Sequence, residues 1–405
     1  MEIYEDELIV ITDQGNNSGL GRRTFEMIRI LKPVFPNIKV LSLNYSGNHL
    51  DGSTKVAQYQ TGNIFNIPVV KFKNIRHIKK NKILDNKNLH LMGSDYRLTT
   101  ISQNMVITLH EYYYVFRNIL RAPSFTEKFK EISYDIGEIQ VKRYARFAKE
   151  VISVSETAHD QILRSIGINS TVIYTTVDKS IFHWRNKEYA RKILSLPLDK
   201  KIILNVSGGG GNKNLKVIDS ISNKLPKDVL IVKVGYPIKN HKIMNVNNVN
   251  EKNYPLYFNA ADLYLHTSSN EGFGIPLLEA ISSGLPIVSS SIPTSVEILG
   301  SSNGPLIREK NDPIAYIEDI ALKLDEDANR EFSERSLIRS NIISSDDKAR
   351  AKYVDVHKRA YNLWKWLMIP DKKIICKDFY LNKFFRDCEK IYVYGPLCPT
   401  SRYAP

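Results

Sequence analysis

The sequence lacks any long hydrophobic run. Among its 405 residues, no apolar stretch approaches the length of about 18 residues that a membrane-spanning helix requires. The first residues, Met1 to Glu7, are acidic, which is unlike the basic start of a signal peptide. We therefore expect an intracellular, cytoplasmic protein.

The sequence is also poor in cysteine. Its three cysteines, Cys376, Cys388 and Cys398, have spacings that fit neither a C-x-x-C pair nor a zinc cluster, and we interpret them as free thiols. The D-x-D sequence at 325–327 is expected on a surface helix, where it is a solvated acidic face. We predict that the protein needs no metal and no other cofactor.

Negative charge is scarce relative to positive charge. Lys and Arg number 57 against 43 Asp and Glu, a net charge of +14, which favours anionic partners without choosing among them. The densest basic stretch, Lys71 to Lys87, has few interleaved aromatic residues to stack on bases, so we do not expect nucleic acid. It is either a solvated basic loop or a patch that faces the acceptor or an anionic membrane surface.

Strand and helix patterns alternate along the chain, and its length suits two domains. Short runs rich in β-branched residues predict strands at 7–12, 39–43, 105–109, 151–154, 171–174, 201–206, 229–234, 262–266 and 286–289. Helical periods separate these runs. The pattern predicts an α/β protein with two Rossmann-like, doubly wound domains that face each other across a cleft.

The domain boundaries follow from the same pattern. We predict an N-terminal domain over 1–178 and a C-terminal domain over 179–350, with the hinge in 175–197, where the periodic signal is weakest. A helix over 351–370 is expected to pack back on the N-terminal domain, and the tail 371–405 has no assigned role. Ligands of such sheets bind beyond the carboxyl ends of the strands, so the site is expected in the cleft.

The most informative stretch is Asn270 to Ala280. Pro276 suits the first position of a short helix, and Gly284 suits the position just after its end. The helix N-terminus offers N–H groups and partial positive charge, so the glycine-containing loop before it can receive a phosphate. Glu279, one turn inside, can accept hydrogen bonds from vicinal hydroxyls such as those of a ribose, and Glu271 faces the other end of the same ligand.

This stretch resembles the E-x7-E signature of family 4 of the retaining glycosyltransferases, which have the GT-B fold. Other segments resemble the same family in the same order: Ser18 to Arg22, Thr108 to Glu111, Ile152 to Glu156 and Val206 to Asn214. Ser155 in the third segment is interpreted equally well as a helix N-cap.

The resemblance implies a set of functional residues. The donor-binding residues are expected to be Gly19, Gly21, Lys213, Gly272, Phe273, Gly274, Ile275 and Glu279. The catalytic set is expected to be Glu271, His110 and Lys213. The implied chemistry retains the anomeric configuration and needs no side-chain nucleophile, with Lys213 on the diphosphate and with His110 and Glu271 on the sugar. The segment 249–257 is expected to hold the base.

The sequence also departs from the family pattern. No arginine occurs in 206–214, where family members usually place one, so the glycine run 208–211, Lys233 or another cation would have to bind the diphosphate in its place. Residues 175–178 read Thr-Thr-Val-Asp in place of the usual Asn-Gly-Val-Asp.

We predict transfer of a sugar from a UDP- or GDP-linked donor to a lipid, glycan or protein-linked acceptor. Two alternatives stay open: a sugar-nucleotide binding module without turnover, and another GT-B enzyme such as a sugar-nucleotide epimerase or a glycoside phosphorylase. A nicotinamide dehydrogenase is disfavoured, because Thr24 stands where the third glycine of a dinucleotide fingerprint would be.

Overall fold

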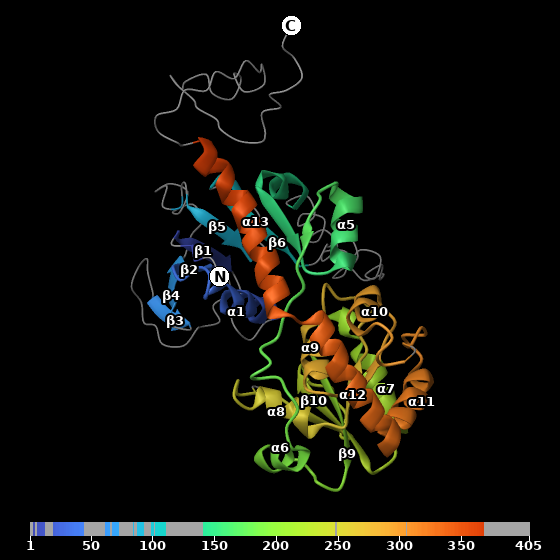
Figure 1. Ribbon diagram of the computed structural model, residues 1–405. Helices are drawn as coiled ribbons and strands as arrows, with labels where there is room; N and C mark the ends of the chain where they lie inside the picture. The colour runs from blue at the N-terminus through green and yellow to red at the C-terminus, as the bar shows by residue number, and fades with distance from the viewer. Residues whose placement is uncertain are drawn as a thin grey trace.

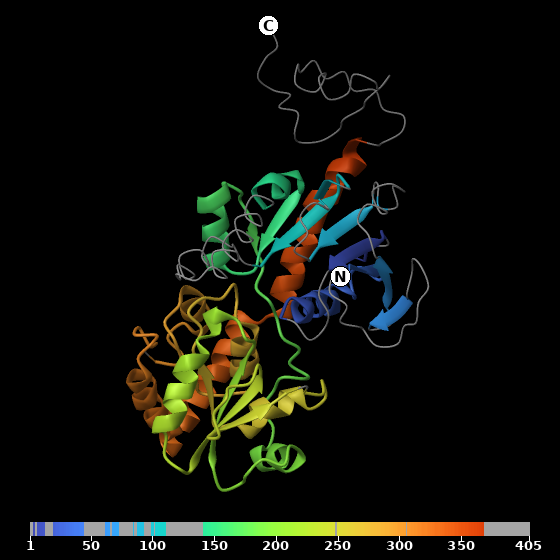
Figure 2. The same ribbon diagram turned by 180° about the vertical axis from the view of Figure 1, so that it is seen from behind.

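Two α/β units, one above the other, make up the protein (Figure 1). The computed structural model describes residues 3–4, 6–12, 19–43, 61–64, 67–72, 84, 87–92, 99–100, 102–110, 141–247, 249–304 and 306–367. Each unit has its own sheet with helices on its faces, as Figure 2 shows from behind. This confirms the predicted pair of Rossmann-like units.

The N-terminal sheet has the strand order β3-β4-β2-β1-β5-β6-β7-β8. Its strands are β1 (Leu8–Thr12), β2 (Ile38–Leu43), β3 (Thr61–Ile64), β4 (Ile67–Phe72), β5 (Asn88–Leu91), β6 (Met105–Leu109), β7 (Glu150–Ser153) and β8 (Thr171–Val172). All pairings are parallel except that of β3 with β4. Strands β1 and β6 are buried along their whole length because helices cover both faces of the sheet.

Two sequence expectations in this unit need correction. Lys71 lies in strand β4, so the basic stretch does not begin in a loop; 73–83 and 85–86 lie outside the described residues. Gly19 and Gly21, which the family resemblance places in a loop after the first strand, lie in the first turn of helix α1 (Gly19–Leu31). Ser18 lies outside the described residues.

The C-terminal sheet has the order β11-β10-β9-β12-β13, and all its pairings are parallel. Its strands are β9 (Lys201–Ser207), β10 (Val229–Gly235), β11 (Ile243–Val246), β12 (Leu263–His266) and β13 (Ile287–Ser289). The helices of this unit are α6 (Lys187–Ile193), α7 (Leu215–Lys224), α8 (Tyr254–Ala260), α9 (Ile275–Ser282), α10 (Pro293–Leu299), α11 (Pro313–Leu324) and α12 (Glu326–Ile343). The carboxyl ends of these strands carry the loops that form the candidate site.

The C-terminal helical region connects the two units. The sequence predicted a helix over 351–370, but helix α13 (Asp346–Leu367) begins five residues earlier, shortly after α12 ends at Ile343. Helix α13 runs along the N-terminal unit beside α1 (Figure 1), and Tyr353, His357 and Ala360 are buried there. Arg29 of α1 pairs with Asp346 at 2.6 Å, which fixes the start of α13.

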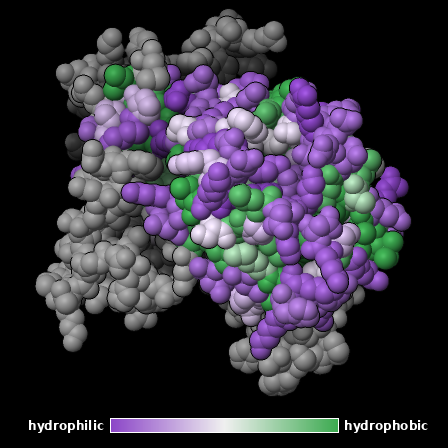
Figure 3. All heavy atoms as spheres, turned by 90° about the horizontal axis from the view of Figure 1, so that it is seen from below, coloured by the Kyte–Doolittle hydropathy of each residue, from purple (hydrophilic) through white to green (hydrophobic). Residues whose placement is uncertain are grey.

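The surface of the C-terminal unit on the side away from the N-terminal unit is mostly hydrophilic, with hydrophobic residues interspersed among the charged ones (Figure 3). Among the described residues, no helix has the length and apolar character needed to cross a bilayer. The tail 371–405 lies outside the described residues.

Candidate active site

The loop before α9 has the backbone geometry that the motif requires. Gly274 is the N-cap residue and has φ of 95°, a left-handed conformation that glycine adopts without a steric penalty. Pro276 occupies the second helical position, one later than expected, because the helix begins at Ile275. Gly284 follows the helix with φ of 77°, as expected of a residue just after a C-cap.

Glu271 is held by a lysine from a different loop. Lys213 ends a 3-10 turn (Gly211–Lys213) before α7, and its Nζ lies 2.5 Å from Oε1 of Glu271. The Ser268 hydroxyl donates to the same oxygen at 2.7 Å. Burial alone would raise the pKa of Glu271, but the charge of Lys213 and these two hydrogen bonds lower it overall. Glu271 is therefore an ionised, oriented carboxylate.

Glu279 is contacted by a side chain of the N-terminal unit. Its side chain is 2% exposed, and Arg22 Nη1 of α1 lies 2.7 Å from Oε1 and 3.1 Å from Oε2. The Tyr254 hydroxyl donates to Oε2 at 2.7 Å, and the Arg22 guanidinium carbon lies 4.9 Å from the centroid of that tyrosine's ring. Burial raises the pKa of Glu279, and Arg22 and Tyr254 offset this only in part.

Arg22 is a site residue that the sequence did not identify. The only sequence feature that could have identified Arg22 is its position directly after Gly19-Leu20-Gly21. Its partner Glu279 lies 257 residues further along the chain, so no local pattern links the two. Both carboxylate oxygens of Glu279 are engaged in this structure. A ribose diol that binds Glu279 must therefore share the carboxylate with Arg22 or displace it.

The two units also meet beside the glycine loop. The Ser155 hydroxyl caps helix α5 (Glu156–Ile166) by accepting from Ala158 N, and it donates to the carbonyl of Gly272 at 2.8 Å. Its interpretation as an N-cap is confirmed. Glu297 of α10 accepts hydrogen bonds from the backbone of Glu156 and from the hydroxyl of Thr157. These contacts hold the motif loop against the N-terminal unit.

His110 lies at the carboxyl end of β6, as predicted. Burial, followed by the charge of Arg23, lowers the pKa of His110 well below its usual value, so the ring is neutral, and a hydrogen bond with the Met92 backbone opposes this shift. Its Nε2 is buried and has no hydrogen-bond partner among the described residues. A neutral ring bonded through its other nitrogen leaves Nε2 as an acceptor for a ligand hydroxyl.

Among the described residues, the site therefore consists of two charged pairs and one imidazole whose Nε2 has no hydrogen-bond partner. Lys213 with Glu271 and Arg22 with Glu279 lie at opposite ends of the motif, and the buried Phe273 lies between its two glycines. No hydrogen bond or ion pair among the described residues joins His110 to either pair. The glycines 208–211 are exposed at the carboxyl end of β9, where their backbone is open to a ligand.

The acidic sequence at 325–327 is not a metal site in the described part of the chain. Asp325 caps α12 through Ala328 N, and the Glu326 side chain is 92% exposed. Among the described residues, no group of three or more His, Cys, Asp or Glu side chains is placed to hold a metal ion.

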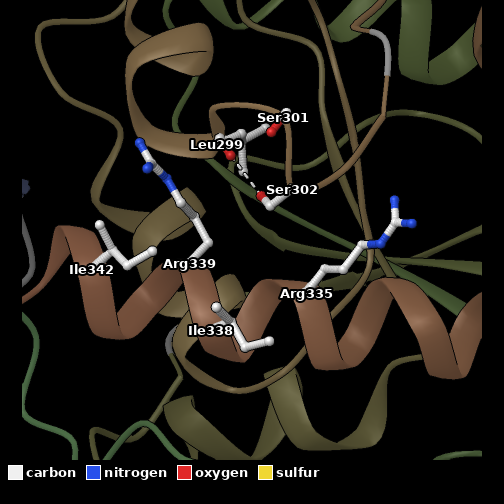
Figure 4. A pocket seen from close by; sticks show the side chains of 7 residues that line it. All are labelled: Leu299, Ser301, Ser302, Arg335, Ile338, Arg339 and Ile342. Atoms are coloured by element: carbon white, nitrogen blue, oxygen red, sulfur yellow. Dashed lines mark hydrogen bonds between the residues drawn. The ribbon is translucent and has the colours of Figure 1, made fainter.

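A pocket between α12 and the segment at the end of α10 is separate from these residues. Figure 4 shows its lining: Leu299, Ser301, Ser302, Arg335, Ile338, Arg339 and Ile342. Arg339 is already engaged there, since it donates to the carbonyls of Ile298 and Glu297 and so ties α12 to α10. None of the predicted site residues lines this pocket.

Comparison with known protein sequences finds similarity to glycosyltransferases. A family model described as glycosyl transferases group 1 matches residues 186–337. The O-antigen chain mannosyltransferase B of Escherichia coli is 34% identical over 85 residues, which are 21% of this chain and 22% of that protein. The O-antigen chain mannosyltransferase RfbU of Salmonella typhimurium is 26% identical over 234 residues, 56% of this chain and 62% of that protein. The matches thus span less than two thirds of these relatives.

Solved structures match over nearly the whole chain. Anabaena Alr3699/HepE, in complex with UDP and glucose, superposes with a TM-score of 0.65 at 13% identity, over 87% of this chain and 99% of that one. WaaG, a glycosyltransferase involved in lipopolysaccharide biosynthesis, superposes with a TM-score of 0.65 at 14% identity, over 85% and 98%. At this identity the likeness shows the fold, and the chain has the GT-B fold.

Proposed function

We propose that the protein is a retaining glycosyltransferase of family 4. It transfers a sugar from a UDP- or GDP-linked donor to a glycan, lipid-linked or protein-linked acceptor. The observation that carries the proposal is the arrangement around α9, where a glycine loop and a helix N-terminus lie between a carboxylate paired with Lys213 and a buried carboxylate that can accept from a ribose. The resemblance of residues 186–337 to group 1 glycosyltransferases supports it.

The proposed mechanism assigns one task to each group. Breaking the bond from the anomeric carbon to the diphosphate places negative charge on the leaving group, which Lys213 and the α9 N-terminus stabilise. Glu279 binds the ribose, while Glu271 and the Nε2 of His110 hold the sugar hydroxyls in the reactive orientation. The acceptor attacks from the leaving-group side, and a phosphate oxygen takes its proton, so no side-chain nucleophile, metal or other cofactor takes part.

The names of the relatives favour one acceptor class. Two of them are O-antigen chain mannosyltransferases, and a third, from Bacillus subtilis, is described as a putative teichuronic acid biosynthesis glycosyltransferase. We therefore propose a growing surface polysaccharide on a lipid carrier as the acceptor. Such an acceptor suits a cytoplasmic enzyme at the membrane periphery, where the positive charge between Lys71 and Lys87 would face anionic lipid.

The proposal predicts stabilisation by nucleoside diphosphates. UDP or GDP is expected to raise the thermal unfolding temperature, because a ligand at 100 times its Kd stabilises the folded state by about 2.7 kcal/mol. Uridine and guanosine, which lack the diphosphate, serve as matched controls and are expected to give a much smaller rise. Equal, negligible effects of all four compounds in a thermal-shift assay would refute a nucleotide-sugar site.

A further inference from the structure

Lys233 is a buried cation without an acidic partner. It lies within β10, and its side chain is 0% exposed. Its Nζ donates to the backbone carbonyls of Ser207 at 2.7 Å and Val234 at 2.9 Å. No ion pair within the described ranges includes it, although burying an uncompensated charge is costly.

The other buried cations of this unit are compensated. Lys323 is also 0% exposed, and it pairs with Asp319 at 2.8 Å while donating to the Ile287 carbonyl. Arg191 pairs with Asp262 at 2.7 Å. Lys233 is as deeply buried as Lys323, but it has no carboxylate partner among the described residues.

The position of Lys233 accounts for the difference. Its Nζ contacts Ser207, the last residue of β9, which directly precedes the exposed glycines 208–211. A Cβ added to the exposed Gly235 would lie 2.6 Å from the Ser207 carbonyl oxygen and 3.9 Å from this Nζ, so a side chain there would crowd the carbonyl that the amine contacts. Anionic ligands of parallel sheets bind at such carboxyl ends, and Lys213 follows on the same loop.

We propose that Lys233 supplies a second positive charge, beside Lys213, to the phosphate groups of the bound nucleotide. This inference rests on the proposed function, because it requires a nucleoside diphosphate in the cleft. The two carbonyls that Lys233 contacts match the two N–H bonds of a neutral amine. Protonation gives the amine a positive charge, which stabilises phosphate groups bound at the carboxyl ends of β9 and β10.

The charges around Lys233 make its protonation depend on the ligand. Burial, followed by the charge of Lys213, lowers the pKa of Lys233 to about 7. Glu271 is already paired with Lys213, and the pKa of His266 is lowered to about 4, mainly by burial, so that ring is neutral at working pH. A bound diphosphate favours the charged form and so raises the pKa of Lys233. Binding at pH 8 then takes up a proton, and the affinity falls as the pH rises from 7 to 9.

Isothermal titration calorimetry measures this uptake directly. Wild-type protein is titrated at pH 8 with UDP and with GDP, in buffers of different ionisation enthalpy; the diphosphate is fully ionised at this pH and contributes no proton of its own. We expect uptake of close to one proton per nucleotide bound. Lys233→Met should abolish the uptake, weaken binding by about tenfold and remove its pH dependence.

The control is the buried ion pair of Lys323 and Asp319. The double variant Lys323→Met with Asp319→Asn removes a buried lysine without touching the cleft, and it should leave proton uptake unchanged. At pH 8 the free amine is mostly uncharged, so Lys233→Met removes mainly its two hydrogen bonds to carbonyls and should fold with a slightly lower unfolding temperature. If Lys233→Met does not fold, the proton uptake measured with the wild-type protein still tests whether a group in the protein becomes protonated on binding.

Two results would overturn the inference. Nucleotide binding to wild-type protein without proton uptake at pH 8, with equal affinity in a folded Lys233→Met, would leave the proposed function intact and make Lys233 structural. Failure of both UDP and GDP to bind wild-type protein would overturn the proposed function and this inference together.

Discussion

Lys213→Ala is expected to lower kcat by about 100- to 1,000-fold, because one preorganised donor at a charge that grows toward the transition state contributes about 3 to 4 kcal/mol. In this structure Lys213 also pairs with Glu271, so the variant leaves that buried carboxylate without its cation. Lys213→Arg keeps the charge and should recover part of the loss. The measurement is the rate of nucleoside diphosphate release under saturating donor.

The matched control for this prediction is Lys216→Ala, which removes an exposed lysine from the first turn of α7 and should leave kcat unchanged. Turnover of the wild-type enzyme should persist in chelator, because lysines and a helix N-terminus neutralise the diphosphate in the proposed site. Loss of activity in chelator with rescue by a divalent ion, together with an active Lys213→Ala, would contradict the assignment.

Glu279→Ala is expected to weaken nucleoside diphosphate binding by about 10- to 100-fold, since the ribose loses a charge-assisted acceptor that contributes about 1.5 to 3 kcal/mol. The kcat of donor-saturated enzyme should change much less, because the ribose lies away from the bond that breaks. Calorimetric titration measures the affinity. Glu318→Ala, on an exposed position of α11, is the control and should bind normally.

The pairing of Glu279 with Arg22 offers a second explanation for such a loss, which a double variant separates. Glu279→Ala alone leaves Arg22 without its carboxylate, whereas Arg22→Ala with Glu279→Ala removes both charges. If the ribose binds Glu279, the double variant retains the loss of affinity. Recovery of wild-type affinity in the double variant would show that the unpaired arginine, rather than a missing ribose contact, had weakened binding.

The sequence predicted the elements whose signals are local. Strand β10 was recognised despite Lys233, because the flanking residues of Val229–Gly235 form a run of β-branched and apolar side chains. Strand β5 was not, since it has four residues and its buried His90 interrupts the apolar pattern while bonding to Thr108 and His357. The break between α12 and α13 was also not predicted, as neither glycine nor proline marks it.

The sequence predicted those parts of the candidate site that lie within short local motifs. The helix at Glu279, its Gly284 end and the position of His110 at a strand terminus follow from local sequence. The contact of Arg22 with Glu279 joins residues 257 apart and depends on how the two units pack. The burial of Lys233 without a carboxylate is likewise a property of packing, since the sequence only showed a lysine within a strand.

Product analysis tests the central claim, turnover of a nucleotide-sugar donor in the cleft, most directly. The protein is incubated with a panel of UDP- and GDP-sugars and lipid-linked glycan acceptors, and the nucleotides are resolved by liquid chromatography with mass spectrometry. The account predicts that one donor yields free nucleoside diphosphate in step with a product carrying one more sugar, and that Lys213→Ala slows the formation of both to the same extent. A donor recovered at unchanged mass as its epimer, or a donor bound tightly with no nucleotide released under any condition, would contradict it.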